Sequence, residues 1–217
     1  MRCFFFPAAL MLLFFAVSPC VQTAAQGSAS TQLADALSVV PKKVFVTSKT
    51  YWGSLGGLVG ADAKCQQLAG AAKLSGVYKA WLASYPVGPL TTFAHSKGPY
   101  QRVDGVIVAN DWISLITKPL LAPISVDQEG QLITTNSPSS PVWTGISIQR
   151  GTLSYFSHVA TCNGWTENQG VNGYGVGPRG FTGIVNNRLN FDWSSLNRPD
   201  FHGTPCDKSA RLYCFEQ

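Results

Sequence analysis

The segment ADAKCQQLAGAAK, residues 61–73, decides how this chain folds. Its small and apolar residues predict a helix, because they recur at the i, i+3, i+4 and i+7 spacing of one helical face: Cys65, Leu68, Ala69 and Ala72. A helix of this kind buries its apolar face, so the spacing places Cys65 inside the protein. Asp62 suits the positive N-terminal end of such a helix. The partner of Cys65 in the core therefore determines much of the architecture.

Three more cysteines follow this helix, namely Cys162, Cys206 and Cys214, whereas Cys3 and Cys20 lie in an apolar leader. Four cysteines in an exported domain predict two disulfide bonds. They can pair in three ways, and the residues alone leave all three open. With both bonds formed, the domain has no thiolate for a covalent mechanism unless Cys20 remains in the mature chain.

Residues 1–25 have the pattern of a secretory signal peptide, with one basic residue, an apolar run and then small residues. Pro7 and Pro19 bracket an apolar run shorter than the roughly 20 residues that cross a bilayer, so we expect no transmembrane span. Cleavage is expected after residue 24 or 25. The alternative is a lipid tether at Cys20, although a proline directly before it fits a lipoprotein motif badly. We expect the protein to be secreted or at the cell surface.

Composition argues for a compact extracellular domain and against a nucleic-acid partner. Charged residues make up 12% of the chain, well below the average of about 25%. The formal net charge is +5, but the lysines and arginines are dispersed and form no basic run of the kind that marks a nucleic-acid surface. The net positive charge is compatible with a mild attraction to acidic glycans.

The chain divides into the leader, a spacer and one domain. Residues 26–42 are rich in Ser, Ala and Gln and are expected to form a flexible spacer, which leaves residues 43–217 for the domain. A second, shorter helix is expected after residues 110–111, running through Leu115 and ending before Pro119. Strands are predicted at residues 44–47, 77–83, 142–145 and 211–215. Loops are predicted at residues 51–60, 136–141 and 163–183, the last rich in glycine. Two helices are too few for parallel crossovers, so the predicted fold class is α+β with a mostly antiparallel sheet.

Separated motifs in a fixed order make this sequence resemble endostatin and, more closely, the bacterial endostatin-like surface proteins (collagenase NC10/endostatin-like domain). The motifs are VFVTS at 44–48, ADAKCQQLA and LSGVYKAWLAS at 61–69 and 74–84, PYQRVDG at 99–105, SPVWTG at 140–145 and TCNGW at 161–165. The resemblance covers residues 43–217.

The resemblance implies a C-type lectin-like fold with nested disulfides, Cys65 to Cys214 and Cys162 to Cys206. The tryptophans that we expect in the structural core are Trp81, Trp143 and Trp165. Some members of that family, spirochaete adhesins among them, bind host matrix proteins or complement regulators. The resemblance therefore implies a binding protein that acts outside the cell.

The sequence offers little for catalysis or for a metal. His95, His158 and His202 stand alone, without the paired spacing of a zinc site. The zinc site of endostatin uses residues near its N-terminus, and the matching stretch here has no histidine. For a calcium cage, the stretch between Trp143 and Cys206 carries only three acidic residues: Glu167, Asp192 and Asp200. We therefore expect no enzyme and no cofactor, with a secreted hydrolase as the least favoured alternative.

The glycine-rich loop and the residues after it supply the candidate binding residues: Tyr174, Arg179, Phe181 and Arg188. Aromatic and arginine side chains dominate the binding energy of many interfaces, and loops expose them. We predict a non-enzymatic, adhesin-like module that binds an extracellular protein or an acidic glycan. A calcium-independent carbohydrate-binding protein and a structural envelope component stay open as alternatives. A glycosaminoglycan site would need arginines to converge on one face: Arg150, Arg179, Arg188, Arg198 and Arg211.

Overall fold

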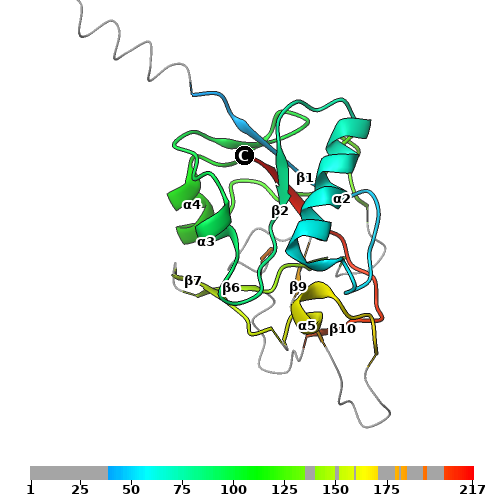
Figure 1. Ribbon diagram of the computed structural model, residues 1–217. Coiled ribbons are helices and arrows are strands. Elements are labelled where there is room, and N and C mark those ends of the chain that lie inside the picture. Colours follow the sequence, from blue (N-terminus) through cyan, green and yellow to red (C-terminus); the bar gives the residue numbers. More distant parts are fainter. Residues whose placement is uncertain are drawn as a thin grey trace, which may run out of the picture. The chain divides into compact units, whose positions relative to one another are not determined.

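The central sheet of the computed structural model has five strands in the order β2-β11-β1-β3-β4 (Figure 1). The described residues are 39–134, 140–149, 152–158, 160–170, 179–180, 182–184, 193–194 and 203–217. The strands of this sheet are β1 (Lys42–Val46), β2 (Tyr78–Ala80), β3 (Tyr100–Arg102), β4 (Ile107–Ala109) and β11 (Tyr213–Glu216). Its pairings are antiparallel except that of β1 with β3. The last strand of the chain therefore lies inside the sheet, between β2 and β1.

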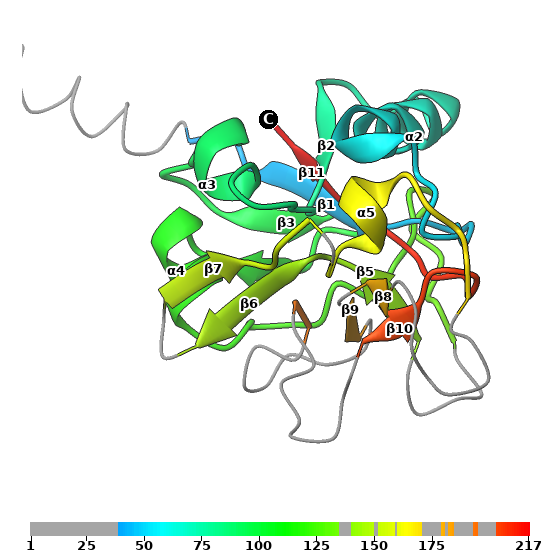
Figure 2. The same cartoon turned by 60° about the horizontal axis from the view of Figure 1, so that its bottom comes forward.

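Within the described residues, six further strands form three antiparallel pairs outside this sheet, seen in the lower part of Figure 2. They are β5 (Pro141–Trp143) with β9 (Thr182–Ile184), β6 (Ile146–Gln149) with β7 (Thr152–Tyr155), and β8 (Arg179–Gly180) with β10 (Thr204–Pro205). The predicted α+β class with a mostly antiparallel sheet is confirmed. The prediction of one irregular loop at residues 163–183 is wrong where β8 and β9 form, because both find partners distant in sequence.

The described residues contain four helices, where the sequence predicted two. They are α2 (Gly57–Ala71), α3 (Pro89–Thr92), α4 (Trp112–Thr117) and α5 (Cys162–Trp165). The unpredicted α3 and α5 have four residues each, too short for apolar periodicity to show. The predicted helix at residues 61–73 is confirmed as α2, but it starts earlier, within the predicted loop at 51–60. Its buried residues are Ala61, Cys65, Leu68 and Ala69.

Side chains of α2 close the outer edge of β2, beside which the helix lies (Figure 1). Gln66 Oε1 accepts a hydrogen bond from Tyr78 N, and Asp62 Oδ1 accepts one from Ala80 N, both at 2.8 Å. Asp62 was expected near the start of the helix, but the earlier start at Gly57 places it in the second turn. Burial there raises the pKa of its carboxyl, against the opposing effect of the Ala80 hydrogen bond. The edge strand is therefore held by the helix that follows the first strand.

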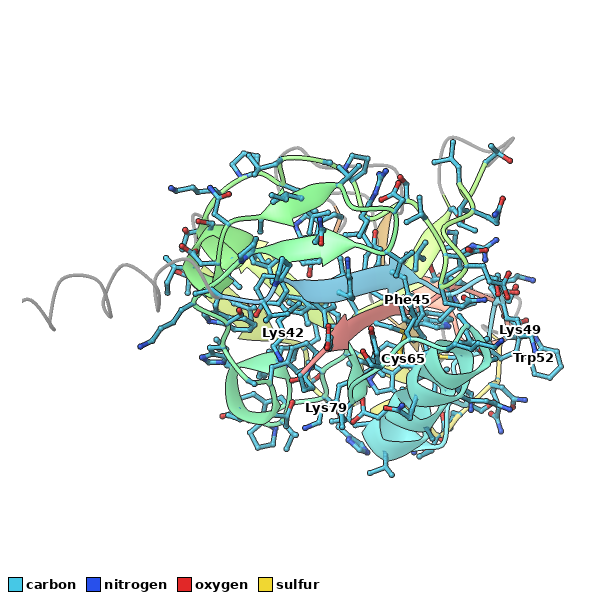
Figure 3. All side chains as sticks on the ribbon, turned by 90° about the horizontal axis from the view of Figure 1, so that it is seen from above. Lys42, Phe45, Lys49, Trp52, Cys65 and Lys79 are labelled. Carbon is cyan, nitrogen blue, oxygen red and sulfur yellow. A yellow bond between two sulfur atoms is a disulfide. The ribbon has the colours of Figure 1, made fainter. Side chains whose placement is uncertain are left out.

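Both predicted disulfides are present, and the nested pairing is confirmed. Cys65 of α2 is bonded to Cys214 of β11, across 149 residues of sequence. Cys162 of α5 is bonded to Cys206, across 44 residues. All four cysteines are fully buried. Figure 3 shows Cys65 where the helix crosses the last strand.

Tryptophans occupy the centres of two buried clusters. Trp81 has no exposed surface and packs against the rings of Phe93, Trp112, Trp193 and Phe215, with centroids 5.2–5.8 Å away. Trp143 and Trp165 lie 5.6 Å apart in a second cluster, which also contains the four disulfide cysteines. Trp165 Nε1 donates to Ala83 O at 2.9 Å. The clusters lie on the two faces of the central strands, because Val44 and Val46 of β1 belong to the first and Phe45 to the second.

The segment α5 is a left-handed turn. All four of its residues have positive φ angles, between 50° and 68°. Left-handed backbone costs roughly 1–2 kcal/mol for each residue other than glycine, so the surrounding contacts must hold this turn. Two hydrogen bonds do so from within, Trp165 N to Thr161 O and Thr166 N to Cys162 O. The Cys162–Cys206 bond and the buried Trp165 ring hold it from outside.

The first strand lies close to the start of the compact unit. The compact unit runs from Val39 to Gln217, and β1 begins at Lys42, inside the range predicted as spacer. Lys42 Nζ donates to Gln217 O at 2.6 Å, which ties the start of the domain to its end. Among the described residues, no helix is both long and apolar enough to cross a membrane.

The predicted cap of the second helix gives a stability test. Asp111 Oδ1 accepts a 2.6 Å hydrogen bond from Ser114 N at the start of α4. We expect Asp111→Ala to lower the free energy of unfolding by about 1 kcal/mol at neutral pH. This hydrogen bond also holds the pKa of the Asp111 carboxyl below its usual value of 3.8. Because the pKa is lowered in the folded state, the stabilisation is complete above about pH 4 and is lost as the pH falls through the folded-state value.

Urea denaturation of the wild type and of Asp111→Ala, at neutral and at acidic pH, measures this contribution. The matched control is Asp111→Asn, which keeps a capping oxygen but does not titrate. The difference between wild type and Asp111→Ala should shrink in acid, and the difference between Asp111→Asn and Asp111→Ala should stay. A wild-type advantage that is independent of pH would contradict the assignment.

Candidate functional site

The predicted binding residues fall mostly outside the part of the chain that the structure describes. Tyr174, Phe181 and Arg188 lie outside the described residues. Arg179 lies in β8, where the backbone is described and the side chain is not. The candidate loop therefore stays a prediction, and the described residues offer a different candidate site.

Of the five arginines proposed for a glycosaminoglycan face, Arg211 forms hydrogen bonds within the protein. Its Nη1 donates to the backbone oxygens of Thr47 and Ser48, both at 2.6 Å. Burial lowers the pKa of this guanidinium. Arg211 is thus engaged beneath the loop that follows β1. Arg150, Arg188 and Arg198 lie outside the described residues.

A hollow of about 460 Å³ lies at the end of that loop. We call it the Trp52 hollow, and its lining residues are Thr50, Tyr51, Trp52, Ser54, Lys64 and Ser209. Three parts of the fold build it: the loop after β1, the exposed side of α2 and the segment before β11. Hydroxyl groups, two aromatic rings and one ammonium group therefore meet in one place.

Backbone pairing fixes the position of Tyr51 and thereby that of its neighbour. Tyr51 N donates to Ala210 O at 2.8 Å, and Ala210 N donates back to Tyr51 O at 2.9 Å. The indole nitrogen of the buried Trp143 also donates to Tyr51 O, at 2.8 Å. Because Tyr51 is held this firmly, Trp52 must project outward. Its side chain is 57% exposed, and Figure 3 shows it at the rim of the molecule beside Lys49.

Lys64 supplies the charge inside the hollow. Its Nζ lies 5.6 Å from the centre of the Tyr51 ring, a cation–π distance, and donates to Leu55 O at 3.0 Å. An ammonium group has three protons, so two donors stay available for a ligand. Burial raises the pKa of the Tyr51 hydroxyl, so this group stays protonated and uncharged at neutral pH. Lys49 and Lys208 add exposed positive charge next to the lining residues Thr50 and Ser209.

Two other hollows among the described residues have several of their lining side chains already stacked or hydrogen-bonded. In the first, of about 370 Å³, the His95 ring lies flat on Trp112 with a centroid distance of 3.9 Å, and Asp111 caps α4. In the second, of about 350 Å³, the Gln128 amide exchanges hydrogen bonds with Ser48. The Trp52 hollow differs because the Trp52 ring is exposed. In addition, the hydroxyls of Thr50, Ser54 and Ser209 have no hydrogen-bond partner in the part of the chain that the structure describes.

The structure brings one serine and one histidine together, which sequence reasoning did not foresee. Ser84 Oγ lies 3.2 Å from His158 Nδ1 and also accepts a hydrogen bond from Thr161 Oγ1 at 3.0 Å. Within the described residues, no carboxylate bonds the other nitrogen of His158, as the third member of a catalytic triad would. Ser84 is largely buried, whereas His158 is exposed. The contact therefore joins the segment after β2 to the one before α5.

The remaining candidates for metal or acid chemistry do not assemble in the described chain. His95 stacks on Trp112, His158 contacts Ser84, and His202 lies outside the described residues. Glu167 accepts a hydrogen bond from Asn163, and Asp192 and Asp200 are not described. Among the described residues, no three or more His, Cys, Asp or Glu side chains lie together so that they could hold a metal ion.

The pair Tyr51–Trp52 is the part of the candidate site that the sequence did not single out. The sequence placed both residues in a loop with four glycines and gave them no role. Two adjacent aromatic residues in a glycine-rich loop were a usable signal, since one of them has to point outward. That Lys64 and Ser209 line the same hollow could not be predicted from the sequence, because they lie in distant parts of the chain.

No protein-family model matches the chain, and no curated protein matches it. The resemblance to endostatin-like proteins and the lectin-like fold that it implies therefore stay predictions, resting on the motifs themselves.

Proposed function

We propose that this protein is an exported, non-enzymatic binding module that recognises an extracellular macromolecule through the Trp52 hollow. The observation that carries the proposal is the exposed Trp52 ring at a hollow lined by hydroxyl and ammonium groups. Tryptophan is among the residues most enriched at binding hot spots, and an exposed indole costs solvation energy that a partner would recover.

The frame around the hollow also supports a binding role. Two disulfides hold the elements around the site together. The backbone of Tyr51 also pairs with that of Ala210, which is distant in the sequence. A rigid site loses little conformational entropy when it binds, which favours affinity. Disulfides of this number are typical of proteins that work in an oxidising compartment. With the signal-like leader, they support a location outside the cytoplasm, on the cell surface or secreted.

Among the alternatives, calcium-independent carbohydrate binding is favoured by a specific observation. The hollow combines hydroxyl groups with an aromatic face, and sugars present both hydroxyl groups and an apolar ring face. The secreted hydrolase has the Ser84–His158 contact in its favour, but that serine is buried and the pair lacks an acid partner within the described residues. The binding module therefore remains the proposal.

Replacing the exposed indole tests the proposal. Trp52→Ala should raise the dissociation constant for the partner by at least about 10-fold, because hot-spot truncations commonly cost more than 1–2 kcal/mol. Its free energy of unfolding should change by less than about 0.5 kcal/mol, since the ring is exposed. Arrays of extracellular-matrix proteins and of glycans, followed by surface plasmon resonance on the positives, provide the measurement.

The matched control is Ile113→Ala, which removes an apolar side chain of similar exposure, 61%, from α4. It should leave binding unchanged. Binding that is lost in Ile113→Ala and retained in Trp52→Ala would move the site to the hollow beside His95. Failure of the wild type to bind anything on either array would contradict the proposed function.

A further inference from the structure

We propose that the Trp52 hollow is built for a uronate, that is, a sugar residue whose ring bears a carboxylate, within an unsulfated acidic polysaccharide. This inference rests on the proposed function and names the ligand class for the same site. Three properties of the lining residues carry it: an exposed aromatic face, hydroxyls that have no hydrogen-bond partner among the described residues, and positive charge.

The aromatic face suits the apolar side of a sugar ring. Trp52 is more than half exposed, while Tyr51 beside it is partly buried and held by the Ala210 and Trp143 hydrogen bonds. One free indole next to a fixed ring offers a platform for one flat, partly apolar unit. An extended apolar peptide would need a longer groove than a hollow of about 460 Å³.

The hydroxyl groups of the lining suit a polyol. Within the described part of the chain, the side chains of Thr50, Ser54 and Ser209 make no hydrogen bond to another protein group. Each hydroxyl can both donate and accept, as can each hydroxyl of a sugar. Three such groups around one hollow therefore match a ligand that presents several hydroxyls at fixed spacing.

The positive charge of the hollow favours a sugar that bears a carboxylate. Lys64 lies inside the hollow with two donors to spare, and Lys49 and Lys208 stand at its margin. Asp207 offsets part of this charge, at 3.8 Å from Lys208. No arginine is among the lining residues that the structure describes. Arginine is the usual bidentate partner of oxyanions, so a lining with a single lysine fits one carboxylate better than a run of sulfates or phosphates.

The test measures binding of the purified full-length protein to four probes at low and at physiological salt. The first is a hexasaccharide that alternates glucuronate with N-acetylglucosamine, and the second is a neutral hexamer of N-acetylglucosamine. The third is a heparin hexasaccharide, and the fourth is an oligoglutamate peptide. We expect the glucuronate probe to bind at least 10-fold more tightly than the neutral one. Its affinity should fall as salt rises, because the attraction at the rim is screened.

Variants locate the interaction. Lys64→Met should weaken glucuronate binding by at least 10-fold, whereas Lys64→Arg should stay within about 3-fold because it keeps the charge. The matched control is Lys118→Met, which removes an exposed charge at the end of α4 and should change binding less than 2-fold. Should Lys64→Met prove unstable, the pair Lys49→Met and Lys208→Met gives the same test at the rim, with a weaker salt dependence expected.

The outcomes separate this inference from the proposed function. Equal binding of the neutral probe, tighter binding of the heparin probe, or binding of oligoglutamate that Lys64→Met abolishes would each overturn the uronate assignment. If matrix proteins bind in a Trp52-dependent way and no saccharide does, the uronate assignment is wrong, whereas the proposed binding module is supported. If no probe and no matrix protein binds, both the uronate assignment and the proposed function are contradicted.

Discussion

Replacing Cys65 and Cys214 together by alanine should lower the free energy of unfolding by about 5 kcal/mol. The bond closes a loop of 149 residues, and in the chain-entropy model a cross-link of that length removes about this much free energy from the unfolded ensemble. The effect matches a large part of the total stability of an ordinary domain, about 5–15 kcal/mol. It is the largest single change that we expect in this protein.

The second disulfide provides the comparison. Replacing Cys162 and Cys206 by alanine opens a loop of 44 residues, for which the same model gives about 4 kcal/mol. Urea denaturation of the two double variants under non-reducing conditions measures both values. A larger loss from the shorter loop would show that the left-handed turn at α5, and not loop closure, dominates the contribution of that disulfide. A loss below about 1 kcal/mol in both variants would contradict the entropic account.

Trp81→Ala should lower the free energy of unfolding by about 3–5 kcal/mol. The ring has no exposed surface and contacts four other aromatic rings, so its removal leaves a cavity at the centre of one buried cluster. Its Nε1 also donates to Ser194 Oγ at 2.9 Å. Loss of this bond leaves a buried hydroxyl without a partner, which adds to the cost.

Two further substitutions separate these effects. Trp81→Phe keeps a ring in the cluster and removes the hydrogen bond, so its cost should lie well below that of Trp81→Ala. Trp52→Ala removes the same side chain from the surface and should change the free energy of unfolding by no more than about 0.5 kcal/mol. Similar losses in Trp81→Ala and Trp52→Ala would contradict the burial assigned to the first residue.

Local sequence patterns predicted the parts of this fold that depend on local chemistry. The apolar spacing around Cys65 identified α2, and the carboxylate of Asp111 identified the start of α4. The α+β class followed from the small number of predicted helices. The nested disulfides came from the resemblance, because the residues alone allowed three pairings.

The rest depends on contacts between distant parts of the chain. Residues 51–60 contain four glycines and predict a loop, yet the last four join α2. Gly56 and Gly57 have φ angles of +84° and +73°, which lets the chain turn sharply into the helix. The left-handed turn at α5 could not be anticipated either, since L-residues adopt that conformation only where tertiary contacts impose it.

The candidate site was the least predictable part of the structure, because it too depends on contacts between distant parts of the chain. Tyr51 and Trp52 look alike in the sequence, and the pairing of Tyr51 with Ala210 decides which of them faces solvent. The partner lies 159 residues away, so no local pattern contains this information. Aromatic residues in glycine-rich loops therefore mark candidate sites, and the tertiary structure decides among them.

The hydrogen bonds that Asp62 and Gln66 accept from β2 also bear on whether another copy of the protein can add a strand to the sheet. An open edge strand is a template on which another chain can add a strand, the first step of edge-to-edge aggregation. Here α2 occupies the N–H groups that β2 would offer, and at the opposite edge Leu121 N donates to Val108 O of β4. Where these hydrogen bonds form, both edges of the central sheet are covered, which opposes the addition of a strand from another copy.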